Sequence, residues 1–207
     1  MWEKALEHVC GMFAAQEKDH STRPGQQFRT RSAHTRRVCM WLDRLLAQGG
    51  AEDTAAVRLA AVFHDAGRIH GAENHGEHSE RILRAYATIE PIPAATVERA
   101  AFLVREHSNK ARWLSDPHAP RNLILLMEAD LLDEEGAMGL ALDCMTAGAL
   151  GLEYEGAYAR MRTYEPPRLT SNPMVTPLAR QLWTDKQRII REFMTAFAFD
   201  LGEADEA

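Results

Sequence analysis

The sequence has few cysteines, no paired cysteine motif and no long apolar run. It contains only Cys10, Cys39 and Cys144, and no two of them form a CxxC pair. This excludes a zinc ribbon and a disulfide framework, because both need closely or regularly spaced cysteines. Three scattered thiols are typical of a protein kept in a reducing compartment, so we expect a cytoplasmic location.

The chain also lacks an excess of basic residues. Its formal net charge is −6, whereas proteins that bind long nucleic acids present a basic surface. No run approaches the roughly 18 apolar residues of a membrane span, and Glu3 and Lys4 interrupt the N-terminal pattern, unlike in a signal peptide. We therefore expect neither long nucleic acid nor a membrane as a partner, while a local basic pocket for a small phosphorylated compound stays possible.

The apolar residues recur at helical spacing, and no stretch shows useful β-alternation. The fold class expected is all-α, a single-domain helical bundle. Helices are predicted over residues 1–18, from 32 to about 47, from a cap at Asp53 into residues 63–65, and over 75–87, 94–107, 123–132 and 177–201. The first helix and its connection (residues 1–27) should pack on a domain of residues 28–201 that ends in the long helix, with a frayed tail at 202–207.

One apolar helical run is followed directly by polar residues. The run over residues 59–63 leads into His64-Asp65, followed by Gly67 and Arg68. Burying an imidazole and a carboxylate is costly unless something binds them, and a divalent transition metal suits both groups. Gly67 is predicted to supply a left-handed helix exit.

Other polar residues fall on apolar helix faces. His34 shares a stripe with Val38 and Trp41, Asp130 lies in the most apolar helix, and His107 follows an inward-facing stripe. A single buried histidine usually has an ordinary hydrogen bond, so a metal-free bundle with core histidines is one interpretation. Several imidazoles and carboxylates pointing into one core favour a shared cation instead.

The ordered set His34, His64-Asp65 and Asp130 resembles the HD-domain superfamily of metal-dependent phosphohydrolases. The flanking segments His34-Thr35-Arg36-Arg37-Val38, Phe63-His64-Asp65, Glu106-His107-Ser108 and Ala129-Asp130-Leu131-Leu132-Asp133 resemble small stand-alone bacterial YedJ-like members over roughly residues 28–200.

This resemblance implies a divalent metal (Mn, Mg, Co, Ni or Fe) held by His34, His64, Asp65 and Asp130, with about one ion per chain. It also implies hydrolysis of a phosphate ester or anhydride of a nucleotide or other small phosphorylated metabolite by a metal-activated water.

Four further residues are candidates for substrate or metal contacts. Arg68 follows the doublet where many family members have lysine, and it is predicted to hold a phosphate oxygen or, alternatively, to contact helix-end carbonyls. His107, together with His75 or His78, could line the pocket as a catalytic or substrate-binding group or hold a second metal.

Two alternative functions are consistent with the same residues. One is a di-iron HD-domain oxygenase, which requires the second metal, and the other is a non-catalytic nucleotide-binding HD module. Leu131 stands where the family usually has Arg, and Glu128 where Asp is common; both leave substrate preference open. The chain is expected to be a monomer or a homodimer.

Overall fold

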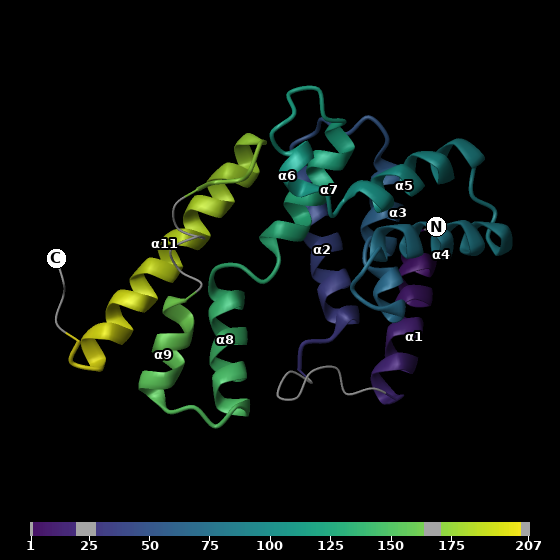
Figure 1. Ribbon diagram of the computed structural model, residues 1–207. Helices are drawn as coiled ribbons and strands as arrows, with labels where there is room; N and C mark the ends of the chain where they lie inside the picture. Colours follow the sequence, from purple (N-terminus) through teal and green to yellow (C-terminus); the bar gives the residue numbers. More distant parts are fainter. Residues whose placement is uncertain (1, 20–27, 164–170, 204–207) are drawn as a thin grey trace. The chain divides into compact units, whose positions relative to one another are not determined.

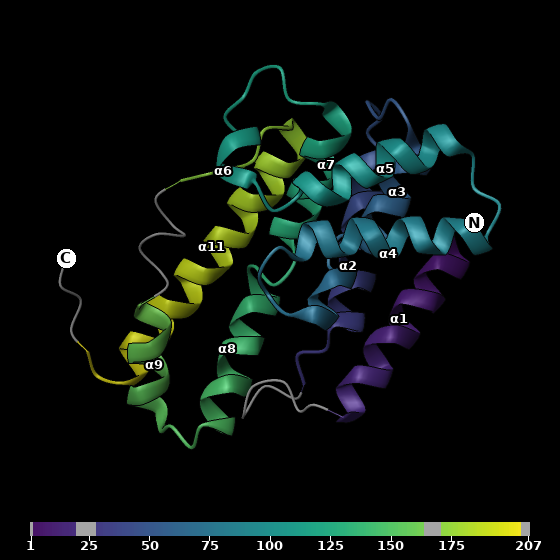
Figure 2. The same cartoon turned by 45° about the vertical axis from the view of Figure 1, so that its right-hand side comes forward.

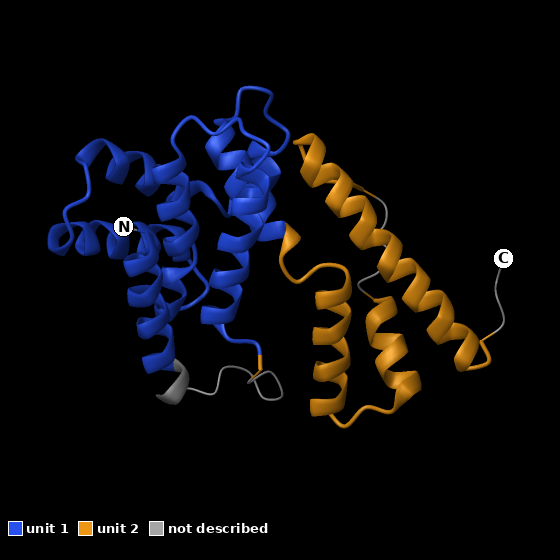
Figure 3. Cartoon of the chain, turned by 180° about the vertical axis from the view of Figure 1, so that it is seen from behind, with its two compact units in different colours: residues 1–21, 29–131 blue, residues 22–28, 132–207 orange. Residues whose placement is uncertain are grey.

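Every regular element that the structure describes is a helix. The structure is a computed structural model, and it describes residues 2–19, 28–163 and 171–203. Within those ranges there are no strands, which confirms the predicted all-α class, and no helix is both long and apolar enough to span a membrane. The chain divides into two compact units, residues 1–21 with 29–131, and residues 22–28 with 132–207 (Figure 3).

The first unit is built around a short helix whose buried residues are all apolar. This helix, α3 (Thr54–Phe63), packs against α1 (Trp2–Asp19), α2 (Arg31–Leu46) and α5 (Ala94–Glu106), and α5 runs beside α4 (His75–Ile89) (Figures 1 and 2). Seven of its ten residues are buried. Its N-terminus is fixed by Asp53, whose side chain accepts a hydrogen bond from the Ala56 amide at 2.9 Å, as expected for the predicted cap.

The end of α3 differs from the prediction at Gly67. The backbone of Gly67 is not left-handed; it lies inside a 3-10 helix, η1 (Ala66–His70), and the positive φ occurs at Gly71, with φ 122° and ψ −179°. Glycine is required at position 67 because a Cβ atom there would overlap the carbonyl oxygen of His75 and lie 2.5 Å from the Ser79 amide nitrogen. The residue therefore permits close packing of η1 on α4 rather than a change of backbone hand.

The remaining helices of the first unit carry the other polar groups of interest. A single turn, α6 (Lys110–Trp113), precedes α7 (Arg121–Leu132), and α7 buries Leu123, Leu125, Leu126 and Met127 almost completely. Asn122, near the start of α7, accepts from the Glu52 amide and donates to the Asp53 carbonyl, at 3.1 Å in both cases. These bonds tie α7 to the beginning of α3.

The second unit consists, in its described part, of three helices around a small core of their own. These are α8 (Ala137–Ala149), α9 (Tyr154–Arg162) and the long α11 (Pro177–Asp200), which begins after the N-cap Thr176. Their core contains Leu140, Tyr158, Met161, Ile190 and Met194.

The predicted helices are present within about two residues of their expected bounds, whereas α6, α8 and α9 have no counterpart among them. The predicted domain boundaries stay a prediction, and much of the predicted connection up to residue 27 and of the predicted tail at 202–207 lies outside the described residues.

Candidate metal centre

Three elements of the first unit bring the four predicted metal ligands together. His34 lies in the first turn of α2, His64 and Asp65 follow the last residue of α3, and Asp130 belongs to the last turn of α7. The Nε2 atoms of His34 and His64 are 3.1 Å apart, and the Oδ1 atom of Asp130 lies 3.3 Å and 3.8 Å from them. Asp65 Oδ2 is 3.7 Å from His34 Nε2 and 3.9 Å from His64 Nε2.

These separations suit a single cation. Ligand atoms bound at right angles to one ion, with bonds of about 2.1 Å, lie about 3 Å from each other. His34, His64 and Asp65 are buried, and the Asp130 side chain is 17% exposed. The donor set of two imidazole nitrogens and two carboxylates fits a divalent transition metal.

The other oxygen of Asp65 faces a second pair of histidines. Asp65 Oδ1 lies 3.4 Å from His75 Nε2 and 3.7 Å from His107 Nε2, and these two nitrogens are 3.3 Å apart. His75 and His107 are both buried. Of the two candidates near the start of α4, the structure therefore brings His75 to the site, and Asp65 joins two groups of potential ligands.

Backbone carbonyl groups fix the hydrogen positions on three of these rings. The Nδ1 atoms of His64, His75 and His107 each lie 2.6–3.0 Å from the carbonyl oxygen three residues earlier in the chain. A carbonyl oxygen only accepts, so each Nδ1 must carry the hydrogen, and each neutral ring then directs an Nε2 lone pair into the site. The facing lone pairs of His75 and His107 need a proton or a cation between them.

Burial and neighbouring charges set the protonation states of the centre. Burial lowers the pKa of His64 from 6.5 to about 4, so this ring is neutral at pH 7. Burial by itself would raise the pKa of Asp65, but His64, His107 and two arginines outweigh it and hold that pKa well below its usual value. The site thus combines a neutral imidazole with an ionised carboxylate, which are the forms that bind metals.

The pKa of Asp130 follows the same rule. Burial would raise it, but the hydrogen bond from His34 and the charge of Lys110 hold it well below its usual value. Burial and the nearby Arg68 lower the pKa of His75. The lowered pKa values favour the ionised carboxylate of Asp130 and the neutral imidazole of His75, which are the states that can bind a metal.

Three cationic side chains contact the carboxylates of the centre. Arg31 Nη1 donates to Asp65 Oδ2 at 2.9 Å, Arg68 Nε lies 2.7 Å from Asp65 Oδ1, and Lys110 Nζ donates to Asp130 Oδ2 at 2.7 Å. The sequence indicated Arg68, and Lys110 was only one of several scattered basic residues. Arg31 was missed, although its position three residues before His34 in the same helix was a usable signal.

His78, the other histidine considered for the pocket, does not join these groups. It is partly exposed, and its ring packs on that of His70 with centroids 5.2 Å apart. Its ring is not among the potential ligand groups that the structure brings together.

Comparison with known proteins agrees with this geometry. The family model of the HD domain matches residues 31–135, about half of the chain, and this range contains all the histidines and carboxylates of the centre. No curated protein sequence matches the chain.

Solved structures share the fold over nearly the whole length of the chain. An HD-superfamily hydrolase from Bacillus thuringiensis superposes with a TM-score of 0.69 at 16% identity, covering 99% of this chain and 100% of its own. Bacillus subtilis YpgQ in complex with ADP gives 0.65 at 19% identity, with 97% of each chain covered. A predicted HD-superfamily hydrolase from an uncultured Thermotogales bacterium gives 0.64 at 19% identity, covering 95% of this chain and 92% of its own. With the family model matching its histidine and aspartate centre, the chain belongs to the HD domain family.

Proposed function

We propose that the chain is a metal-dependent phosphohydrolase that acts on a nucleotide or another small phosphorylated metabolite. The observation that carries the proposal is the position of Asp65, which presents one oxygen to each of two histidine pairs and also contacts two arginines. Metal ligands and phosphate-binding cations thus share one centre. The resemblance to YedJ-like members and the ADP bound to Bacillus subtilis YpgQ support a nucleotide as substrate.

The primary ion would be held by His34, His64, Asp65 and Asp130. When bound, such an ion lowers the pKa of water and polarises phosphate oxygens. The residues of the chain supply the rest of the chemistry. The Ala61 carbonyl group binds Nδ1 of His64 and leaves its Nε2 atom to face the site, and burial keeps this imidazole neutral.

Arg31, Arg68 and Lys110 would orient the substrate. Guanidinium groups bind phosphate through two parallel hydrogen bonds, and an ammonium group acts as a point charge. Each of these groups contacts a carboxylate that is a proposed ligand. When those carboxylates neutralise a metal, the cations can turn to phosphate oxygens and stabilise the charge that develops on them.

His75 and His107 support either a second ion or a direct substrate contact. Their Nε2 atoms face each other and one oxygen of Asp65, so a second divalent cation would satisfy all three atoms. This observation also favours the di-iron oxygenase as a second candidate function. We prefer hydrolysis because three cationic side chains at the centre serve a phosphate group better than they serve an oxygenase.

The test is metal-dependent phosphate release. Purified chain should cleave members of a panel of nucleotides and phosphate esters with Mn²⁺, Mg²⁺, Co²⁺ or Ni²⁺, and EDTA should stop the reaction. Asp65→Asn should reduce turnover by more than the roughly 10- to 100-fold loss that follows removal of a residue that only orients a ligand. The matched control is Asp43→Asn, which removes a surface carboxylate of α2 that pairs with Arg58 instead.

The outcomes separate the candidate functions. Turnover that persists in EDTA or in Asp65→Asn would contradict the proposal. Nucleotide binding without turnover would identify a non-catalytic binding module. About two irons per chain, with oxygen consumption and no phosphate release, would establish the oxygenase.

A further inference from the structure

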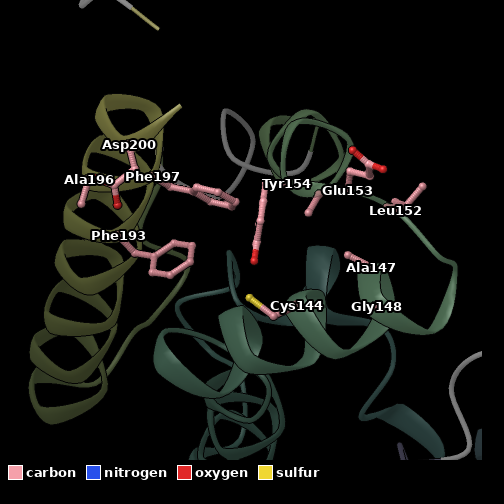
Figure 4. A pocket seen from close by; sticks show the side chains of 11 residues that line it. Cys144, Ala147, Gly148, Leu152, Glu153, Tyr154, Phe193, Ala196, Phe197 and Asp200 are labelled. Atoms are coloured by element: carbon pink, nitrogen blue, oxygen red, sulfur yellow. The ribbon is translucent and has the colours of Figure 1, made fainter. Parts of the chain in front are cut away.

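The second unit contains a pocket that the proposed function does not use. It lies between α8, α9 and α11, has a volume of about 430 Å³, and is lined by residues between Cys144 and Asp200 (Figure 4). Pockets that bind small molecules commonly have volumes of roughly 300–1,000 Å³. None of its lining residues belongs to the candidate metal centre.

Aromatic rings form much of its wall. Phe193 and Phe197 come from α11 and Tyr154 from the first turn of α9, and Figure 4 shows the three side chains directed toward the same space. Phe197 packs edge-to-face against Phe193, with centroids 5.6 Å apart, and against the buried Tyr158 at 5.5 Å. The Phe197 ring is therefore held in place by its neighbours.

Among the described residues that line the pocket, the charged ones all have the same sign. They are Glu153, the N-cap of α9, and Asp200, the last residue of α11, and no described lysine, arginine or histidine joins them. Within the described part of the chain, neither carboxylate has a hydrogen-bond or ion-pair partner. A ligand in this pocket would therefore meet aromatic rings together with the negative charge of these two carboxylates.

From these features we propose that the pocket binds an organic cation, an ammonium group attached to an apolar body. Aromatic faces attract such cations through the ring quadrupole, and desolvation inside a pocket strengthens that attraction. The two carboxylates add charge complementarity. They also disfavour a symmetric contact with a second copy of this face, because such a contact would bring like charges together.

The first experiment uses benzyltrimethylammonium as the probe and phenylmethanesulfonate as the matched anion with the same ring. Calorimetry should detect binding of the cation and none of the anion. Cys144 provides a local reporter, because it is exposed at the pocket while Cys10 and Cys39 are buried. Saturating cation should slow alkylation of Cys144 by iodoacetamide several-fold, as read by peptide mass spectrometry.

Variants then test which groups recognise the cation. Asp200→Asn and Phe193→Leu should each weaken binding by about 2- to 30-fold, the range expected when one ionic or cation–π contact is lost. Glu192→Gln is the control, because this carboxylate lies on the same helix but pairs with Arg188 away from the pocket. Both pocket variants change solvent-accessible residues, and melting curves will verify their folding.

Three results would overturn the proposal. The first is equal binding of the anion, and the second is binding that Asp200→Asn and Phe193→Leu leave unchanged. The third is neither binding nor protection of Cys144 up to roughly 10 mM cation, which would put the binding free energy below about 3 kcal/mol. Phosphate release is measured separately and has no bearing on the result.

Discussion

Three histidines of the centre are oriented by the same kind of local hydrogen bond. His64, His75 and His107 each donate Nδ1–H to the carbonyl oxygen three residues earlier. His64 and His107 each directly follow the last residue of a helix, where carbonyl groups lack their usual partners, whereas His75 begins α4 and uses a carbonyl group of the preceding loop. The same hydrogen bond satisfies an otherwise unpaired carbonyl and directs Nε2 inward, so local backbone structure prepares the metal ligands.

The neutral state of His64 predicts acid sensitivity of the metal-free protein. Its pKa falls from 6.5 to about 4 on folding, so between these values the unfolded chain binds a proton that the folded chain does not. The free energy of unfolding should thus be unaffected by this residue above about pH 6.5 and should decrease as the pH falls below it. The expected loss is about 2 kcal/mol between pH 6.5 and about pH 5, measured by urea unfolding in EDTA.

The control for this prediction is His64→Gln, which removes the titrating group. Its unfolding free energy should vary less with pH over the same interval, whatever its absolute stability. Asp65 and Asp130 do not interfere, because their pKa values are lowered from 3.8 and their contribution is lost only at more acidic pH. An unchanged slope in His64→Gln would show that other groups cause the acid sensitivity.

The cationic side chains predict an effect on substrate binding. Arg31→Met and Lys110→Met should each raise KM for the phosphorylated substrate by about 10- to 100-fold at saturating metal, because each removes a charged hydrogen bond of about 1.5–3 kcal/mol. Steady-state kinetics will measure this. Arg58→Met, which removes a cation paired with Asp43 on the surface, should leave KM unchanged. A fall in metal content instead of a rise in KM would indicate that Arg31 and Lys110 act only on the metal ligands.

At the scale of the elements, the contact of η1 with α4 depends on one glycine. Gly67→Ala should reduce the free energy of unfolding by more than about 2 kcal/mol, because its Cβ would meet backbone atoms of His75 and Ser79 that cannot move independently. It should also displace His75 from the site. Gly11→Ala is the matched control, since its Cβ would have no atom within 4 Å, and in a helix it should be neutral or stabilise by up to about 1 kcal/mol. Similar melting temperatures for the two variants would contradict this account.

The elements that the sequence predicted well have strong local signals. Asp53 before an apolar run and Pro177 after Thr176 define helix starts because capping is a local interaction. In contrast, α9 has only a weak apolar pattern, in which Ala157, Tyr158 and Met161 are buried by contact with other helices. Gly67 was assigned the wrong role for a related reason: the backbone it approaches belongs to another helix, and sequence spacing carries no information about that contact.

The same distinction applies to the candidate centre. His34, His64, Asp65 and Asp130 were predicted as one set because each interrupts an apolar pattern and their order resembles that of the HD family. The choice of His75 over His78 depends on which face of α4 meets α5, and the contribution of Arg31 depends on how α2 approaches the end of α3. Both are facts of tertiary packing. Their roles as ligands and substrate contacts stay predictions.

At the scale of the whole molecule, the two compact units predict a localised response to metal. All the proposed ligands come from residues 34–130, in the first unit. A ligand that binds only the folded state stabilises it by mass action, and hydrogen exchange reports that stabilisation region by region. Saturating Mn²⁺ should therefore slow exchange, relative to EDTA, in peptides from α2, the α3–η1 segment and α7, with a smaller change in α8, α9 and α11.

Asp65→Asn separates specific binding from a general effect of the ion. This variant should show little metal-dependent protection in any peptide, because it removes the carboxylate that both histidine pairs share. Protection confined to α8, α9 and α11 would contradict the assignment of the metal centre. Equal protection of both units in the unmodified chain would show that they open together, and the metal would then stabilise the molecule as one cooperative unit, not through the first unit alone.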